Sequence, residues 1–277
     1  MKKVPGFSLL LIIVSALSIP FISSCSKSDR SKDTDLQSAK DMSLAYAIQN
    51  DLNRQLNVFA GSQPELNAVP GPVVSNPCGG TVVTGTVFPK VDSISFGIAD
   101  CTGPDGANRR GTLVVTFTGN YRDSLTTITI SPRNYYFNGY KVAGVFTIKN
   151  MGMNWAGHPW FKETATNCYF NYPNGKLVTW NSTQTREMIQ GSSTPLVFDD
   201  IYQLQGTATG SSSDGNRMDV YINTPLVFSM NCPWIESGTL YLVPANLGNR
   251  FINFGTGACD NTADLWIYGD KYKLYLD

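Results

Sequence analysis

The strongest constraint on the fold is a series of Asn-Gly and Asp-Gly pairs that separate runs of alternating apolar and polar residues. The clearest runs lie at 112–118 and 271–276. Alternation with a period of two predicts half-buried strands with one apolar face. Because Asn-Gly and Asp-Gly tolerate positive φ angles, they favour the type I′ turns of two-residue hairpins. The pairs are Asp105-Gly106, Asn138-Gly139, Asn174-Gly175 and Asp214-Gly215.

Hairpin after hairpin predicts a mainly β fold, an extended antiparallel meander that forms either an open sheet or a sandwich. Strands and helices do not alternate along the chain, so a parallel sheet is not expected. Composition agrees, since 12% of the residues are aromatic and only 15% are charged, and aromatic residues favour strands. We expect this antiparallel β domain to occupy residues 78–277.

One segment, residues 36–60, has helical periodicity instead. Its apolar residues recur at spacings of three and four, which places them on one face of an α-helix. They are Met42, Ala45, Ile48, Leu52, Leu56 and Phe59, and the polar residues Lys40, Asn50, Asp51 and Arg54 lie opposite. Asp35 can cap the helix, and Gly61 and Pro64 end it. We expect this amphipathic helix to cover a face or edge of the sheet, with docking on a partner helix as the alternative; residues 61–77 form a linker.

The N-terminus has the pattern of a lipoprotein leader. Basic residues precede an apolar run at 7–22 that is too short to span a membrane as a helix. The run ends in Ile-Ser-Ser-Cys25, which resembles a lipobox, so residues 1–24 are expected to be a signal peptide and Cys25 to carry the lipid. An ordinary signal peptide or membrane anchor with a chance cysteine is the alternative. Residues 25–35 would form a polar tether.

Two cysteine-containing segments resemble each other. The pattern Phe-Gly-x-x-x-Cys at 96–101 recurs at 254–259, and each copy has another cysteine upstream, before a Gly-Thr pair. We interpret the two segments as related hairpin modules, one at each end of the β region.

The cysteines predict two disulfides. An exported protein keeps its disulfides, so we expect the bonds Cys78–Cys101 and Cys232–Cys259. Each would contribute about 3 kcal/mol by the chain-entropy model. Cys168 is left over, and we expect it to be a free thiol that packs as a small apolar residue.

No residues form a recognisable catalytic, metal-binding or cofactor-binding constellation. His158 is the only histidine, and without a nucleophile motif such as G-x-S-x-G it is expected to be an ordinary loop residue. The carboxylates that could form a glycosidase pair are Glu163, Glu187, Asp199 and Asp200, but any β protein offers such pairs. The Asp-Asn clusters at 214–219 and 260–264 lack the spacing of a calcium loop and are expected to be turns. A balance of 21 basic and 21 acidic side chains argues against binding of nucleic acid.

Aromatic side chains crowd the segment 135–180. Exposed aromatic rings stack on sugars or anchor protein partners. Tyr135, Trp155 and Trp160 are therefore candidate contacts for a glycan or protein ligand. Packing in the core and across strands is the alternative role.

Three motifs together resemble a group of uncharacterised, β-rich outer-membrane lipoproteins typical of Bacteroidota. They are Trp-Asn-Ser-Thr-Gln-Thr-Arg-Glu at 180–187, Asn-Gly-Tyr-Lys-Val at 138–142 and Phe-Gly-x-x-x-Cys-Asp at 254–260. The stretch 186–191 departs from the pattern, which has an aromatic residue after Glu. The resemblance covers most of the chain and implies a lipidated protein of the cell envelope, but it brings no catalytic or ligand residues.

The expected function follows from these features. We expect a non-enzymatic binding or surface-interaction protein without a cofactor, attached to a membrane through its N-terminal lipid. The resemblance implies that this membrane is the outer membrane. A hydrolase that acts on envelope glycans or peptides is the alternative.

Overall fold

The structure is a computed structural model that describes residue 1 and residues 33–66, 82–83 and 87–276. Its helices and strands all lie within the unit Asp33–Asp277. The expected signal peptide, Cys25, Cys78 and most of the tether and linker lie outside the described residues. None of the helices in the described part of the chain is both long enough and apolar enough to cross a membrane.

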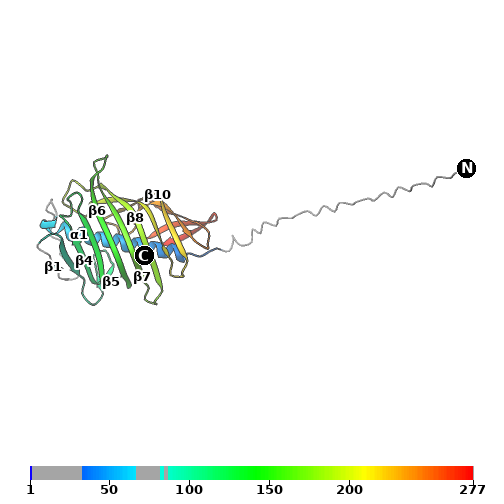
Figure 1. Cartoon of the computed structure of the whole chain (residues 1–277), viewed down its shortest axis with the longest axis horizontal. Helices are drawn as coiled ribbons and strands as arrows, with labels where there is room; N and C mark the ends of the chain where they lie inside the picture. The colour runs from blue at the N-terminus through cyan, green and yellow to red at the C-terminus, as the bar shows by residue number, and fades with distance from the viewer. Residues whose placement is uncertain (2–32, 67–81, 84–86, 277) are drawn as a thin grey trace. The chain divides into compact units, whose positions relative to one another are not determined.

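Within the described residues, fourteen strands form one antiparallel sheet in which each strand pairs with the next along the chain (Figure 1). Among the described strands only β3 leaves this order, pairing with β4 beside the main path. The predicted antiparallel meander is therefore confirmed, and it is an open sheet. The strands are β1 (Val82–Val83), β2 (Lys90–Ser95), β3 (Cys101–Thr102), β4 (Asn108–Phe117), β5 (Thr127–Phe137), β6 (Tyr140–Met153), β7 (Pro159–Asn171), β8 (Leu177–Gln190), β9 (Ile201–Ser211), β10 (Arg217–Ser229), β11 (Ser237–Pro244), β12 (Arg250–Thr256), β13 (Thr262–Ile267) and β14 (Asp270–Tyr275).

The Asn-Gly and Asp-Gly pairs close hairpins by two kinds of turn. Asn138 (φ +48°) and Gly139 (φ +84°) both have positive φ, as the predicted type I′ turn requires. The type I′ prediction is wrong for the other three pairs. At the β7–β8 turn, Gly175 N donates to Tyr172 O (2.9 Å) and Tyr172 N donates to Lys176 O (2.9 Å). A type I turn followed by a left-handed glycine makes these bonds in a three-residue loop.

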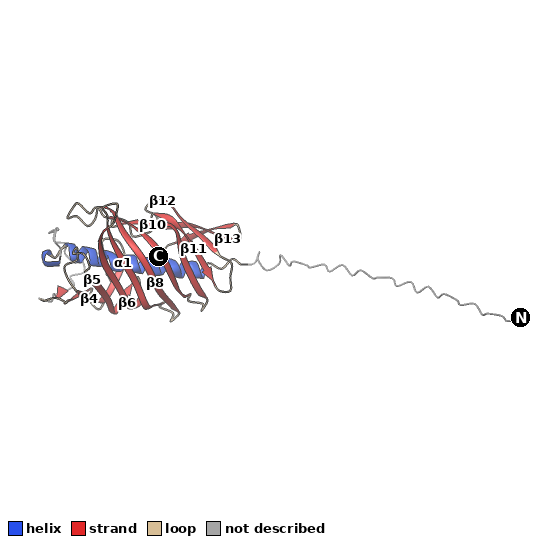
Figure 2. Cartoon of the chain, turned by 45° about the horizontal axis from the view of Figure 1, so that its top comes forward, coloured by secondary structure: helices blue, strands red, loops and turns tan. Residues whose placement is uncertain are grey.

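Helix α1 (Gln37–Gly61) lies inside the curve of the sheet (Figures 1 and 2). A short 3₁₀ turn, η2 (Pro64–Leu66), follows it. The apolar face of α1 packs in the core as predicted, and Asn50 and Asp51 on the opposite, polar face are buried as well. As whole residues they are only 8% and 3% exposed, because strands surround the helix instead of covering one side of it.

Strand residues supply partners for the buried polar face of α1. Arg109 Nε on β4 donates to Asp51 Oδ1 (2.8 Å), and Tyr135 Oη on β5 donates to Asp51 Oδ2 (2.6 Å). At the start of the helix, Gln37 N donates to Asp35 Oδ1 (2.7 Å), so Asp35 satisfies one of the free helical amides as expected. The carboxylate of Asp51 can thus be buried because Arg109 compensates its charge and Arg109 and Tyr135 donate hydrogen bonds to it.

The two ends of α1 lie against different loops. Near its start, Asp41 accepts hydrogen bonds from Tyr172 Oη (2.6 Å) and Ser213 N (2.7 Å), in the β7–β8 and β9–β10 turns. Beyond its end, Leu66 O accepts a hydrogen bond from Tyr121 N in the β4–β5 loop. The loops β4–β5, β6–β7 and β8–β9 therefore gather at the C-terminal end of the helix.

The two Phe-Gly-x-x-x-Cys segments share local structure. In each copy the Phe side chain is 4% exposed, and the following Gly has a positive φ, +86° in the first and +90° in the second. The structure contains the expected disulfide Cys232–Cys259, with Cα atoms 5.7 Å apart. Because Cys78 lies outside the described residues, its bond to Cys101 stays a prediction.

Cys168 on β7 is a free, buried thiol. Burial raises the pKa of this thiol to about 12, so it stays protonated and has the character of a small apolar residue. The Cys168 side chain also explains why a glycine occupies the facing position on the neighbouring strand, β6. Gly144 has a φ of +116°, and a Cβ atom there would lie 2.5 Å from Cys168 Sγ.

Candidate functional site

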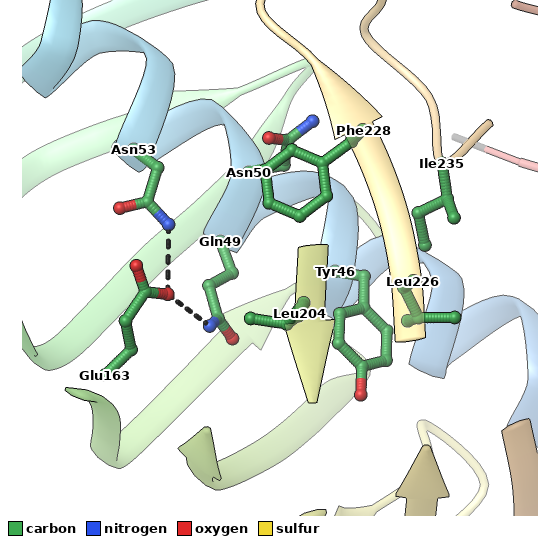
Figure 3. Close-up of a pocket in the computed structure, with 9 residues that line it drawn as sticks. All are labelled: Tyr46, Gln49, Asn50, Asn53, Glu163, Leu204, Leu226, Phe228 and Ile235. Carbon is green, nitrogen blue, oxygen red and sulfur yellow. Dashed lines mark hydrogen bonds between the residues drawn. The ribbon is translucent and has the colours of Figure 1, made fainter. Parts of the chain in front are cut away.

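The polar face of α1 meets a buried carboxylate of β7. Glu163 Oε2 accepts hydrogen bonds from Gln49 Nε2 (3.3 Å) and Asn53 Nδ2 (3.2 Å), as Figure 3 shows. Gln49 Nε2 also donates to Gln184 Oε1 on β8 (2.6 Å). The space beside these groups is about 20 Å³, which is room for roughly one water molecule. We interpret this cluster as structural, because a larger molecule does not fit.

Arg186 on β8 connects the Glu163 cluster to the region beyond it. Its Nε lies 2.5 Å from Glu163 Oε1, and its side chain is fully buried. The guanidinium lies against the rings of Phe161 (5.0 Å) and Tyr202 (4.5 Å). Burial alone would lower the pKa of Arg186, but the Glu163 carboxylate outweighs burial and raises it. Arg186 therefore stays charged, with its charge compensated by Glu163.

A cavity of about 420 Å³ lies next to Phe161, which lines it. It is formed by the β4–β5 loop, the neighbouring ends of β6, β7 and β8, and the start of the β8–β9 loop. Phe161, Met188, Met153 and Pro159 are its apolar lining. Its volume lies in the range of small-molecule sites, whereas the spaces beside α1 hold about 10–20 Å³. We call this space the end cavity.

Arg122 is the cationic residue in the wall of the end cavity. It is half-buried, and its Nη2 donates to Thr194 O (3.4 Å). Among the described residues, no carboxylate oxygen lies within the 4.0 Å of an ion pair with Arg122. Asn150 Nδ2 donates to Arg122 O (3.2 Å) and Tyr121 O (3.4 Å), so the backbone that carries Arg122 is held in place.

Polar groups complete the lining. Two serines are part of it. Ser124 lies in the β4–β5 loop with Arg122, and Ser192 lies in the β8–β9 loop. Tyr121 also lines the cavity and is 4% exposed. Burial raises the pKa of Tyr121, although Arg186 opposes this. The cavity therefore has one cation, several neutral polar groups and an apolar wall.

Asp200, at the start of β9, is a buried acid behind these loops. Its side chain is 1% exposed, and its Oδ2 accepts a hydrogen bond from Tyr202 Oη (3.0 Å). Burial raises the pKa of Asp200 to about 6, although Tyr202 and Arg122 oppose the shift. This group changes charge near pH 6.

Exposed apolar side chains surround the same loops. Met153 lines the cavity and is 67% exposed, so the cavity opens to solvent at this edge. Other exposed apolar residues of these loops are Leu125 (63%), Trp155 (107%), Leu196 (49%) and Phe198 (42%). An apolar molecule that enters here would first meet apolar surface.

The three aromatic residues predicted to contact a ligand have different environments. Tyr135 is fully buried and donates its hydroxyl to Asp51, so its assignment as a ligand contact is wrong. It packs in the core because its strand faces α1. Trp160 is half-buried. Trp155 is fully exposed at the β6–β7 turn, beside the end cavity.

The sole histidine pairs with a carboxylate on the outer face of the sheet. His158 Nδ1 lies 2.6 Å from Glu187 Oε1, and Gln203 Nε2 donates to Glu187 Oε2 (2.8 Å). Burial would raise the pKa of Glu187, but hydrogen bonds from His158, Asn154 and Gln203, in that order, lower it below its ordinary value. Met188 follows Glu187 and lines the cavity, so alternation directs Glu187 to the opposite face.

The four carboxylates considered for a glycosidase pair do not converge on the cavity. Glu163 is paired with Arg186, and Glu187 lies on the outer face. Asp199 accepts hydrogen bonds from Thr194 Oγ1 (3.0 and 2.9 Å), and Asp200 is bonded to Tyr202. None of the four lines the end cavity.

The Asp-Asn clusters form turns and ion pairs. Asp260 Oδ1 accepts hydrogen bonds from Thr262 N (2.9 Å) and Thr262 Oγ1 (2.6 Å). Asp214 pairs with Lys176 (2.6 Å). Within the described residues, no group of three or more His, Cys, Asp or Glu side chains is arranged to hold a metal ion.

The residues that form the end cavity were not singled out by sequence reasoning. Arg122 comes from a segment that carries no motif, and Met188 stands in the stretch that departs from the motif pattern. Only the curvature of the sheet brings them together. Comparison of the chain with protein-family models, curated proteins and solved structures finds no match.

Proposed function

We propose that the protein is a non-enzymatic, lipid-anchored protein of the cell envelope that binds a small amphipathic molecule in the end cavity. The observation that carries the proposal is the cavity itself, about 420 Å³ in volume. Binding sites for small molecules are mostly apolar with a few placed polar groups. Phe161 and Met188 supply the apolar wall here, and Arg122 supplies the polar group.

The proposed location rests on the sequence. The lipobox at Cys25 and the resemblance to outer-membrane lipoproteins of Bacteroidota support a lipid-anchored protein of the outer membrane. The disulfide Cys232–Cys259 supports a compartment outside the reducing cytosol. The described fold begins at Asp33, whose carboxylate accepts hydrogen bonds from Arg250 Nη1 and Nη2 (both 2.8 Å). This pair fixes the start of the fold at the N-terminal end of α1, whereas the end cavity lies at the other end.

Binding of a neutral fluorescent probe to a filled and an unfilled cavity tests the proposal. N-phenyl-1-naphthylamine gains fluorescence in apolar surroundings, and it carries no charge. Ser192 lines the cavity, so Ser192→Trp should occupy part of the space and reduce probe binding about tenfold, the effect of losing 1.4 kcal/mol. Ser193 is the exposed neighbour outside the lining, so Ser193→Trp is the matched control. Equal binding by all three proteins would contradict the proposal.

The alternative, a hydrolase that acts on envelope glycans or peptides, would have to use other residues. The pair of His158 and Glu187 is a hydrogen-bonded base and acid at the surface, next to the exposed Trp155. A screen of envelope glycans and peptides for turnover separates the two functions. Turnover that His158→Gln abolishes would replace the binding proposal.

A further inference from the structure

We infer that the end cavity selects an anionic amphiphile, a single-chain carboxylate whose head binds Arg122 and whose chain lies against Phe161 and Met188. This inference rests on the proposed function and adds the chemical class of the ligand. It follows from how charge, hydrogen-bonding groups and apolar surface are distributed around the cavity.

The charge of the cavity wall is positive. Arg122 has no carboxylate partner within 4.0 Å among the described residues. Of the neighbouring acids, Asp199 accepts hydrogen bonds from Thr194, and Asp200 accepts one from Tyr202 and attracts Arg122 only from beyond ion-pair distance. The second cation of this region, Arg186, is compensated by Glu163 and is not among the residues that line the cavity. A guanidinium without an ion-pair partner at contact distance can pair with one carboxylate.

The position of Arg122 is fixed before any ligand binds. Asn150 Nδ2 donates to the carbonyls of Tyr121 and Arg122, and Asn150 Oδ1 accepts a hydrogen bond from Gly152 N (2.8 Å). The Arg122 side chain itself donates to Thr194 O. A group held in this way loses less conformational freedom on binding, and the planar guanidinium matches the geometry of a carboxylate.

The remaining lining suits the two ends of such a molecule. Ser124 and Ser192 offer hydroxyl donors on the loops beside Arg122. Phe161 and Met188 are 3% and 4% exposed and form the deep apolar wall. An alkyl chain therefore gains from burial there, while a carboxylate keeps contact with the cation.

Displacement of N-phenyl-1-naphthylamine by three ligands with the same chain tests the inference. The protein is residues 25–277 with Cys25→Ser, expressed without the expected signal peptide so that it carries no lipid. The competitors are decanoate, decanol and decylamine. Decanoate should bind most tightly. Arg122→Gln should weaken decanoate binding by roughly ten- to a hundredfold, the effect of losing one charged hydrogen bond, and should leave decanol unchanged.

Charge variants keep the test decisive. Arg122→Lys should retain most of the preference for decanoate, and Arg122→Glu should reverse it in favour of decylamine. Arg217 is an exposed arginine at the opposite loops, on β10, and its side chain is 72% exposed; Arg217→Gln should change nothing. Circular dichroism of each variant checks that the fold is retained.

The possible results separate the two proposals. Equal binding of decanoate and decanol, unaffected by Arg122→Gln, would overturn the anionic class and leave the binding function standing. Loss of all three ligands in a folded Arg122→Gln variant would also overturn it, because Arg122 would then act on cavity structure. Both proposals would be overturned if the probe did not bind the parent protein, or if Ser192→Trp did not reduce its binding.

Discussion

Arg109 on β4 and Asp51 on α1, 58 positions apart in sequence, form an ion pair between helix and sheet that solvent barely reaches. Their side chains are 3% and 2% exposed. Burial would lower the pKa of Arg109, but Asp51 and Asp105 raise it above its ordinary value. The enclosed helix is therefore held by charge as well as by apolar contact.

Asp51→Ala is expected to destabilise the protein by about 3 kcal/mol. Removing one partner of a buried pair leaves the other charge desolvated and costs about 3–5 kcal/mol. The loss of stability should lie at the lower end of this range, because Asp105 still accepts a hydrogen bond from Arg109 (Nη1–Oδ1 2.9 Å). Urea denaturation measures the change. Asp214→Ala breaks the exposed pair with Lys176 and is the control that should shift the midpoint little. An equal effect of both substitutions would show that the buried pair has no special role.

Asp200→Asn is expected to stabilise the protein at high pH only. Burial raises the pKa of Asp200 from 3.8 to about 6, so the folded state binds this proton more tightly than the unfolded state. The stability contributed by protonated Asp200 is fully present below about pH 4 and is lost as the pH rises through about 6. At pH 8 the variant avoids a cost of about 2–3 kcal/mol.

Urea midpoints at pH 4, 6 and 8 check this expectation. The difference between Asp200→Asn and the parent should grow from near zero at the lowest pH to its full value at the highest. A difference that is the same at all three pH values would mean that ionisation of Asp200 is not its cause.

The meander was predictable because its signals are local. Alternation at 112–118 and 271–276 and the turn at Asn138-Gly139 each depend on a few adjacent residues. The helix was predictable for the same reason, but its burial was not. Asp51 belongs to the polar face of an amphipathic pattern, and no feature of the neighbouring sequence indicates that it pairs with Arg109. Compensation from distant strands overrides the expectation that a polar helix face meets water.

The end cavity could not be predicted from the sequence either. Its cation lies in a turn-rich loop, where a lone Arg122 is an ordinary surface residue. Its apolar wall uses Phe161 and Met188, which any sheet would bury. The aromatic clusters drew attention to Tyr135, which is a core residue, because sequence alone does not say which face of a strand is enclosed.

Four cysteines should form two disulfides, and Cys168 should stay a free thiol. Non-reducing peptide mapping should recover Cys232 joined to Cys259 and, as the sequence predicts, Cys78 joined to Cys101. Cys168 should react with a thiol reagent only after unfolding, because it is buried and its pKa is raised to about 12. Mapping after reduction is the control. A disulfide between Cys168 and any other cysteine would contradict the pairing.

Cys25→Ser should abolish lipid attachment without changing the β fold. Cys25 lies outside the described residues, and the helices and strands of the described fold begin at Gln37. Attachment by lipid gains about 0.8 kcal/mol for each buried CH₂ group, and stable anchoring needs two chains or a second signal. The variant could stay at the membrane through an uncleaved signal peptide, so fractionation does not distinguish the two modes. Metabolic labelling with a fatty-acid probe does, and Cys168→Ser, which should keep its label, is the matched control. Label that persists in Cys25→Ser would show that another residue carries the lipid.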